Sequence, residues 1–257
     1  MPEVESAAPG GATEESTLPP LPEASAQQDP RARFVDVPMV RYHLALFARS
    51  QRWLPPVLLY GGALVIDAGG GDNLGDTLGF SAALLLPAVA WLTRAMCTAE
   101  PLEIRYITAG VHGPVAARIS ALAAAAGYGL LFAAFGFLVA FASSGAPAPA
   151  GSWSAAAGPA QTAVCGVLVE VLCVLLGTAA GAVFAPPLVE SAAVSVLGTG
   201  ILALGVAFAP FSPANMCIRA LVGTTGSETG TLAVAGPVAL ALTAVAWFVA
   251  GQAAARR

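Results

Sequence analysis

The sequence predicts an all-α, polytopic membrane protein with six transmembrane helices. Of its 257 residues, 57% are hydrophobic and only 10% are charged, whereas a soluble domain carries about 25% charged residues. The mean hydropathy is +0.76, and long apolar segments alternate with short polar ones after residue 53. Because backbone groups in hydrocarbon must form hydrogen bonds within their own segment, these segments are predicted to be helices.

Residues 1–35 are predicted to form a disordered, acidic, proline-rich cytoplasmic tail. Six of the fifteen acidic residues precede the first arginine, Arg31, and large apolar residues are scarce there. Such a segment buries too little surface to offset the entropy cost of ordering. It lacks the positive start and early apolar run of a signal peptide. Residues 36–257 are predicted to form the membrane domain.

The predicted spans cover about 54–68, 78–96, 119–142, 162–185, 191–210 and 231–252. Five of them approach or exceed the roughly 20 residues that cross a hydrocarbon core. The first span is short and would need compensation from Trp53 or from the local bilayer. Pro186 and Pro187 predict a short loop before the fifth span, although one kinked or re-entrant element remains an alternative.

Arginine predicts the orientation, because all eleven basic residues are arginines. With six spans, only Arg219 lies on one side, and the other side holds ten: Arg31, Arg33, Arg41, Arg49, Arg52, Arg94, Arg105, Arg118, Arg256 and Arg257. The positive-inside rule makes that second side cytoplasmic, with both termini. The predicted location is the cell (cytoplasmic) membrane.

Residues 36–53 are predicted to form an amphipathic interfacial helix before the first span. In a helix, successive residues are rotated by about 100°, which places Arg41, Arg49 and Arg52 on one side. The opposite side carries Val40, Leu44 and Phe47. A basic amphipathic helix beside a span lies in the membrane interface. The predicted interface anchors are Arg41, Arg49, Arg52 and Trp53.

The sequence does not favour an enzyme. Its two histidines, His43 and His112, form no H-E-x-x-H motif, and "GTTGSETG" at 223–230 lacks the lysine of a phosphate loop. Asp72, Asn73 and Asp76 fit a solvated turn better than a calcium loop. No metal site or bound cofactor is expected, and the predicted role of all four cysteines is apolar packing: Cys97, Cys165, Cys173 and Cys217.

Glu170 is the clearest anomaly, since it lies inside the fourth predicted span. A carboxyl group at the membrane centre costs about 2.5–3.5 kcal/mol on insertion scales. It is a candidate for one of two roles, a residue of the transport path or a polar residue that links helices. The third alternative is that Glu170 lies near the outer interface of the membrane. Gly177 and Gly181 lie in the same span and are four residues apart. This spacing predicts compact helix packing without a specific interface.

The segment between the second and third spans, residues 93–119, is long and charged for a simple turn. It is interpreted either as a docking surface for a cytoplasmic partner or as a solvated loop. The charged and titratable candidates are Glu100, Glu103, Arg105 and His112.

Three stretches, "RYHLALFARSQRWLPPVLLY", "LLPAVAWLTRAM" and "AEPLEIRYITAG", resemble the integral-membrane permease subunits of ABC transporters. The closest likeness is to the six-span, actinobacterial-like type-2 exporters. It covers residues 38–257 in layout and 38–120 at residue level. The acidic tail, the short first span and Glu170 are not part of that pattern.

This resemblance implies a second permease copy or a related permease, a cytoplasmic ABC ATPase subunit that binds ATP and Mg, and a coupling loop at 99–115. It also implies a short helical excursion at "SPANMCIRALVG". The expected function is therefore export by an ABC permease in the lipid bilayer, without nucleic acid. The alternatives are an ion-coupled secondary transporter or channel that uses Glu170, and a non-transporting membrane scaffold or assembly factor.

Overall fold

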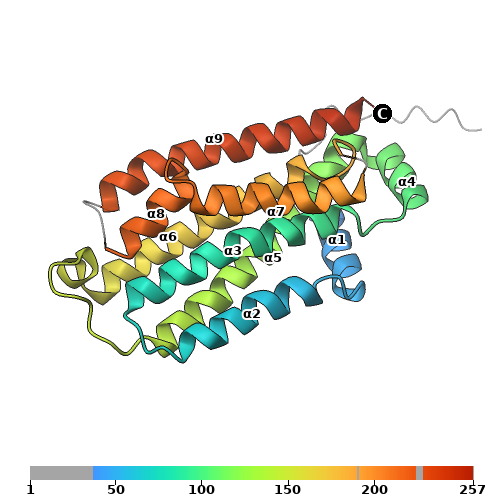
Figure 1. Cartoon of the computed structure of the whole chain (residues 1–257). Coiled ribbons are helices and arrows are strands. Elements are labelled where there is room, and N and C mark those ends of the chain that lie inside the picture. Colours follow the sequence, from blue (N-terminus) through green and yellow to red (C-terminus); the bar gives the residue numbers. More distant parts are fainter. Residues whose placement is uncertain (1–36, 190, 224–227, 257) are drawn as a thin grey trace, which may run out of the picture. The chain divides into compact units, whose positions relative to one another are not determined.

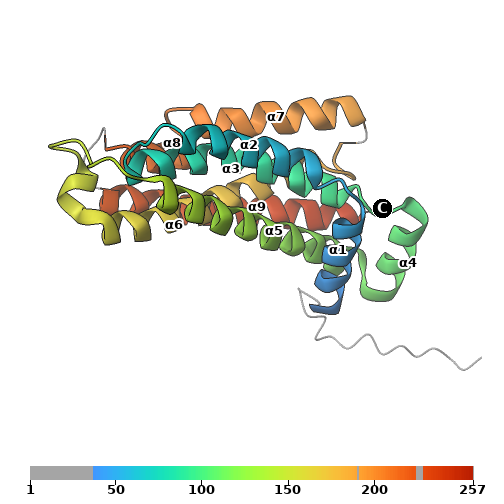
Figure 2. The same cartoon turned by 90° about the horizontal axis from the view of Figure 1, so that it is seen from below.

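The computed structural model describes residues 37–189, 191–223 and 228–256; the predicted tail, Glu190 and residues 224–227 of "GTTGSETG" lie outside them. The regular structure of the described residues is α-helical (Figures 1 and 2). The helices are α1 (Val37–Arg49), α2 (Leu54–Ala68), α3 (Leu74–Cys97), α4 (Leu102–His112), α5 (Pro114–Ser143), α6 (Trp153–Val183), α7 (Ala192–Phe208), α8 (Pro213–Leu221) and α9 (Glu228–Ala255).

Each of the six predicted apolar segments forms a helix: α2, α3, α5, α6, α7 and α9. Several helices extend beyond the predicted bounds, because capping residues start them inside the polar connections. The side-chain oxygen of Asn73, for example, accepts hydrogen bonds from the backbone N–H groups of Gly75 and Asp76. This caps α3, so the turn considered above for calcium begins a helix.

The segment 143–160, predicted to be a loop, is partly helical. The Ser152 hydroxyl accepts a hydrogen bond from the Ala155 N–H at 3.3 Å and starts α6. The helix is interrupted at Gly158, which has a φ of +78° and is followed by Pro159. Glycine adopts this conformation without a steric penalty, and proline offers no N–H to continue the helix across it.

Four helices, α3, α5, α6 and α9, are long and apolar enough to cross a membrane. The pair α7–α8, bent by 48°, makes a fifth candidate, and α2 is a shorter apolar helix of 15 residues. α8 confirms the expected short helix after the fifth apolar segment. These lengths and compositions define a helical, membrane-embedded class of protein with four or five candidate spans in the described residues.

The long helices run alongside one another (Figures 1 and 2). α1 and α4 lie at one end, where α3 and α9 finish and α5 begins, and α8 lies at the opposite end (Figure 1). We call the first of these the α4 end. It contains the last residue of α3 (Cys97), the first residue of α5 (Pro114) and the last residue of α9 (Ala255). The α4 end gathers segments that are far apart in the sequence.

α3 and α6 form the centre of the helix packing. A Cβ atom on Gly177 would lie 2.8 Å from the Leu86 carbonyl oxygen, and one on Gly181 would lie 2.5 Å from that of Ala90. The two glycines therefore face successive turns of α3, which lets the two backbones approach closely. The predicted compact packing is confirmed, and the structure adds that this pair of glycines makes a defined α3–α6 contact within the chain.

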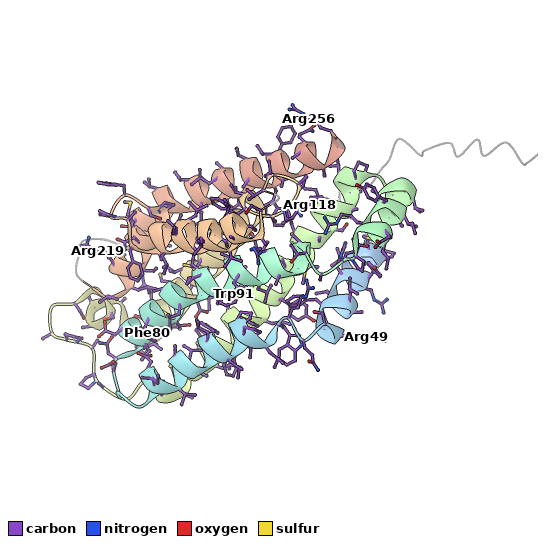
Figure 3. The ribbon with its side chains drawn as sticks, turned by 45° about the vertical axis from the view of Figure 1, so that its right-hand side comes forward. Arg49, Phe80, Trp91, Arg118, Arg219 and Arg256 are labelled. Carbon is purple, nitrogen blue, oxygen red and sulfur yellow. The ribbon has the colours of Figure 1, made fainter. Side chains whose placement is uncertain are left out.

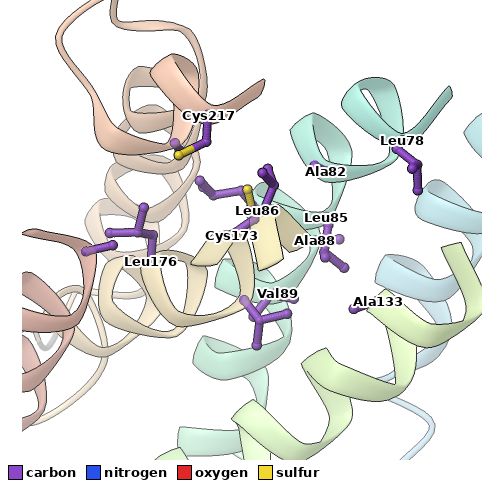
Figure 4. Packing of buried hydrophobic residues seen from close by; sticks show 14 of the residues in the cluster. Leu78, Ala82, Leu85, Leu86, Ala88, Val89, Ala133, Cys173, Leu176 and Cys217 are labelled. Atoms are coloured by element: carbon purple, nitrogen blue, oxygen red, sulfur yellow. The ribbon is translucent and has the colours of Figure 1, made fainter. Parts of the chain in front are cut away.

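The main core surrounds this contact (Figure 4). Leu85, Leu86 and Val89 of α3 are fully buried there, together with Cys173 of α6. All four cysteines are buried, which confirms their predicted packing role.

The outward faces of the long helices are strongly apolar. Large exposed side chains occur on four helices: Leu58 and Ile66 of α2, Leu131 and Leu138 of α5, Leu197 and Ile201 of α7, and Val234 and Phe248 of α9. Apolar surface this extensive is far beyond the scattered apolar residues of a soluble surface. Lipid is the environment that suits it, as the charge deficit of the sequence predicted.

Candidate functional site

α4 lies within residues 99–115, the coupling loop that the resemblance implies. It begins after Pro101 and ends at Gly113, whose φ is +85°. Ile104, Ile107 and Val111 are exposed, the last two to 66% and 73%. Their spacing of three and four residues places them on one side of the helix. We call these three residues the α4 face; it is a short apolar surface at the α4 end.

The four residues predicted for docking fall into two pairs. Glu103 and His112 are exposed on α4. Glu100, in contrast, is buried and accepts hydrogen bonds from the Tyr42 hydroxyl and the Thr108 hydroxyl, both at 3.3 Å. Arg105 is half-buried and donates to the backbone oxygens of Cys97 at 3.0 Å and Glu100 at 3.3 Å. The second pair holds α4 against the protein instead of presenting charge to a partner.

The predicted helix is present as α1, although it ends at Arg49 and not at residue 53, and its apolar face has a protein neighbour. Phe47 is fully buried and lies edge-on against Tyr128 of α5, with ring centroids 5.4 Å apart. The Tyr128 hydroxyl donates to the Leu44 carbonyl oxygen at 3.2 Å. The apolar side of α1 therefore packs on α5, and its burial does not require lipid.

The predicted interface anchors differ in their contacts. Arg41 and Arg49 are exposed on α1. Arg52 donates from Nη1 to the Thr98 carbonyl oxygen at 2.7 Å, and the Trp53 indole donates to that of Ala48 at 3.1 Å. Two anchors therefore have local structural partners, while the first two face outward.

Arginines from other segments reach the carboxyl ends of the two central helices. Arg105 binds the carbonyl group of Cys97, the last residue of α3, and Arg52 binds that of Thr98, the residue that follows it. Arg118 Nη2 donates to Ala182 O of α6 at 3.4 Å. The final carbonyl groups of a helix lack intrahelical partners and carry partial negative charge. Figure 3 shows Arg118 and Arg49 toward this end and Arg219 toward the other.

A fourth arginine acts through a serine. Arg94 of α3 donates from Nε to the Ser195 hydroxyl of α7 at 2.7 Å, and that hydroxyl donates to Phe184 O at 2.5 Å. The relay ties α3 and α7 to the end of α6. The arginines predict the orientation, but these capping contacts could not be predicted, because most of them join residues distant in the chain.

Glu170 lies in a second polar cluster, buried among the long helices. Its Oε1 accepts a hydrogen bond from the Ser81 hydroxyl of α3 at 2.8 Å, and the Ser81 and Tyr60 oxygens are 2.9 Å apart. Ser81 has one proton, which it donates to Glu170, so the Tyr60 hydroxyl is the donor to Ser81. The cluster thus links α2, α3 and α6 by consecutive hydrogen bonds.

Two residues of α5 enclose this cluster. The Phe132 ring stacks on Tyr60 with a centroid distance of 5.8 Å. Gly136 lies directly against the hydroxyl groups of Tyr60 and Ser81, so a Cβ atom there would overlap both. Glu170 itself is only 2% exposed. The sequence singled out Glu170, but neither hydroxyl partner, since a tyrosine or a serine in an apolar segment carries no distinguishing signal.

A groove of about 350 Å³ between α5 and α6 passes beside Glu170. Apart from Glu170 it is lined by apolar side chains, including Leu130, Phe137 and Val167. The chemistry that this arrangement supports is a polar link between helices in an apolar setting. Within the described residues no three His, Cys, Asp or Glu side chains are grouped so that they could hold a metal ion.

A comparison with protein-family models gives no match, and comparisons with curated proteins and with solved structures give none either.

Proposed function

We propose that the chain is the membrane-spanning permease subunit of an ABC transporter, which exports a substrate with ATP hydrolysed by a separate cytoplasmic subunit. The observation that carries the proposal is the α4 face. Ile104, Ile107 and Val111 expose an apolar strip at the end of the long helices, next to the exposed carboxylate of Glu103. A short helix held between two spanning helices can pass a partner's movement on to both.

The proposal includes six spans, with α2 and α7 added to the four long helices, and both termini in the cytoplasm. α2 has only 15 residues, so the bilayer would thin locally around it. The arginines of the α4 end support this orientation by the positive-inside rule. ATP and Mg would be bound by the partner, in keeping with the resemblance noted in the sequence.

The α4 face resembles the core of a small protein interface, which is depleted in charge and rimmed by polar groups. Glu103 and His112 would belong to the rim. The second pair, buried Glu100 and half-buried Arg105, would act from inside by holding α4 in place.

The ion-coupled alternative assigns transport to Glu170. The contacts of Glu170 support the interhelix role instead, because its carboxylate accepts a hydrogen bond from Ser81 and the adjoining groove is apolar. A non-transporting scaffold would share the α4 face but would not couple it to transport.

The test is a matched pair of substitutions, Val111→Gln on α4 and Val37→Gln on α1. Both valines are exposed, at 73% and 63%, on short helices of the same end. The tagged full chain is purified in mild detergent from its native host, and a retained ATPase is identified by its phosphate-loop sequence. Val111→Gln should lower its retention and its stimulated ATP hydrolysis about fivefold, as for the loss of one interface contact above 1 kcal/mol.

Val37→Gln should leave both quantities within about twofold of the wild type. Absence of any phosphate-loop ATPase from the wild-type preparation would overturn the proposed function. Equal losses in the two variants would reject α4 as the docking element. Retention of an ATPase without ATP-dependent export in vesicles would favour the scaffold.

A further inference from the structure

A cavity of about 910 Å³ lies beneath α4 at the ends of the long helices. Its lining includes Cys97 at the end of α3, Pro114 at the start of α5 and Ala254 near the end of α9. The ends of membrane-spanning helices coincide with the headgroup region of a bilayer. The cavity is therefore placed at the depth of lipid phosphate groups.

The polar part of the lining carries excess positive charge. It contains the guanidinium groups of Arg105 and Arg118, the imidazole of His43 and the carboxylate of Glu100. Guanidinium groups stay charged in proteins, so two cations face one anion. Glu100 already accepts hydrogen bonds from Tyr42 and Thr108, which leaves it poorly suited to neutralise both arginines.

Two of these side chains are more than nine-tenths buried and hold an unpartnered nitrogen. Arg118 is 8% exposed and its Nε–H has no hydrogen-bond partner; His43 is 5% exposed and its Nε2 has none. Arg118 Nη2 makes only a long contact of 3.4 Å, to Ala182 O. An unpaired polar group in the interior costs free energy, and more so when it is charged. Both residues line the same cavity, so an anion bound there would lie beside both side chains.

The rest of the lining is apolar and includes Met96, Ala109, Ala121 and Pro186. A free inorganic anion would leave this surface uncovered, whereas an amphiphile would cover it with its glycerol and upper acyl carbons. Charge, depth and shape thus favour the same type of ligand.

We propose that this cavity binds the phosphate headgroup of an anionic phospholipid, with Arg118 and His43 as its direct contacts. The Nε–H and one Nη–H of a guanidinium present two parallel donors that suit two phosphate oxygens. A zwitterionic lipid also carries phosphate, but its cationic end would meet Arg105 and Arg118. The proposal rests on the membrane-embedded class of the chain and does not depend on ATP-driven export.

The test compares lipid binding to the full chain in nanodiscs or mild detergent, measured by native mass spectrometry with phosphatidylglycerol and phosphatidylcholine as probes. The wild type should prefer phosphatidylglycerol. Arg118→Gln should weaken its binding about tenfold, as expected for loss of a charge-assisted contact. Arg49→Gln removes an exposed arginine at the same end and is the matched control; it should change binding by less than about twofold.

A second variant guards against misfolding, because Arg118 also caps α6. His43→Phe fills a similar volume and removes the unpartnered nitrogen. It should weaken phosphatidylglycerol binding about threefold and still unfold cooperatively in lipid-free detergent, although it loses the hydrogen bond of His43 with the Ala117 backbone. If Arg118→Gln does not fold, unchanged lipid binding by His43→Phe overturns the proposal.

Equal phosphatidylglycerol binding by the wild type and a folded Arg118→Gln would also overturn it. So would equal losses in Arg118→Gln and Arg49→Gln, which would indicate general surface attraction. A titration with inorganic phosphate distinguishes the source of the anion: stabilisation by phosphate without a preference for phosphatidylglycerol would reject the lipid. None of these measurements uses an ATPase, so failure here leaves the Val111→Gln result standing.

Discussion

The Ser81 hydroxyl of α3 donates a hydrogen bond to Glu170 Oε1 of α6 at 2.8 Å, and both residues are almost completely buried. This contact joins the two central helices at a carboxyl group, which is costly to place in a membrane. It gives Glu170 a structural role that can be separated from transport by substitution.

Ser81→Ala should lower the free energy of unfolding by about 1–2 kcal/mol, because the Tyr60 hydroxyl and Glu170 both lose a partner. Glu170→Gln retains an acceptor oxygen and should cost less than about 1 kcal/mol. Reversible unfolding in detergent measures both, with Ser144→Ala, at a peripheral serine, as the control. If the proposed function holds, export should survive Glu170→Gln. Loss of export at normal stability would instead favour the ion-coupled alternative.

Gly136→Ala should destabilise the protein by about 1–3 kcal/mol, as for overpacking in a well-packed core. The new methyl group would overlap the hydroxyls of Tyr60 and Ser81. Gly127→Ala, in the same helix, meets no atom within 4 Å and should raise stability by up to about 1 kcal/mol. Thermal midpoints in detergent compare the two variants. Equal effects of the two would contradict the close approach at Gly136.

The six-span proposal predicts opposite accessibility at the two ends. Cysteines introduced at Asp72 and Ala146, exposed positions in the α2–α3 and α5–α6 connections, should react with an impermeant maleimide in intact cells. A cysteine at Glu103 should react only after permeabilisation. The native cysteines are buried, so the wild type provides the background. Labelling of all three cysteines in intact cells would contradict the six-span topology.

His43 should make stability depend on pH. Burial lowers its pKa from 6.5, although the nearby Glu100 carboxylate opposes this shift. The unfolded chain therefore binds the proton more readily, and stability should fall as the pH drops through about 6.5, by at most about 1.4 kcal/mol per pH unit. Unfolding measured between pH 8 and 5 in neutral detergent should show a shallower decline for His43→Phe. Parallel curves for the two proteins would exclude this contribution.

Much of the fold was predictable from local pattern. Runs such as 119–142 predict helices because hydrocarbon admits no unpaired backbone group, and α5 covers that run. Helix ends were predicted less well. Asn73 and Ser152 begin helices inside polar connections, where a short polar side chain suits a cap and a loop equally well.

The site shows the same division more sharply. Glu170 could be singled out because a carboxylate in an apolar run is costly wherever it points. Its partners could not, since Tyr60 and Ser81 acquire their roles only when α2, α3 and α6 pack together. Glu100 and Glu103 looked equivalent as loop acids, yet packing buries the first against Tyr42 and exposes the second.

The sequence by itself determined that the chain is helical and membrane-embedded, because composition and segment length decide whether a peptide can be dissolved in lipid. Only the tertiary structure decided which small residues face a neighbour and which arginines bind helix ends. Gly177 and Gly181 differ from other glycines only in the backbone of α3 that lies against them. Arg118 and Arg49 are alike in the sequence, but packing leaves one beside a cavity and the other on the surface.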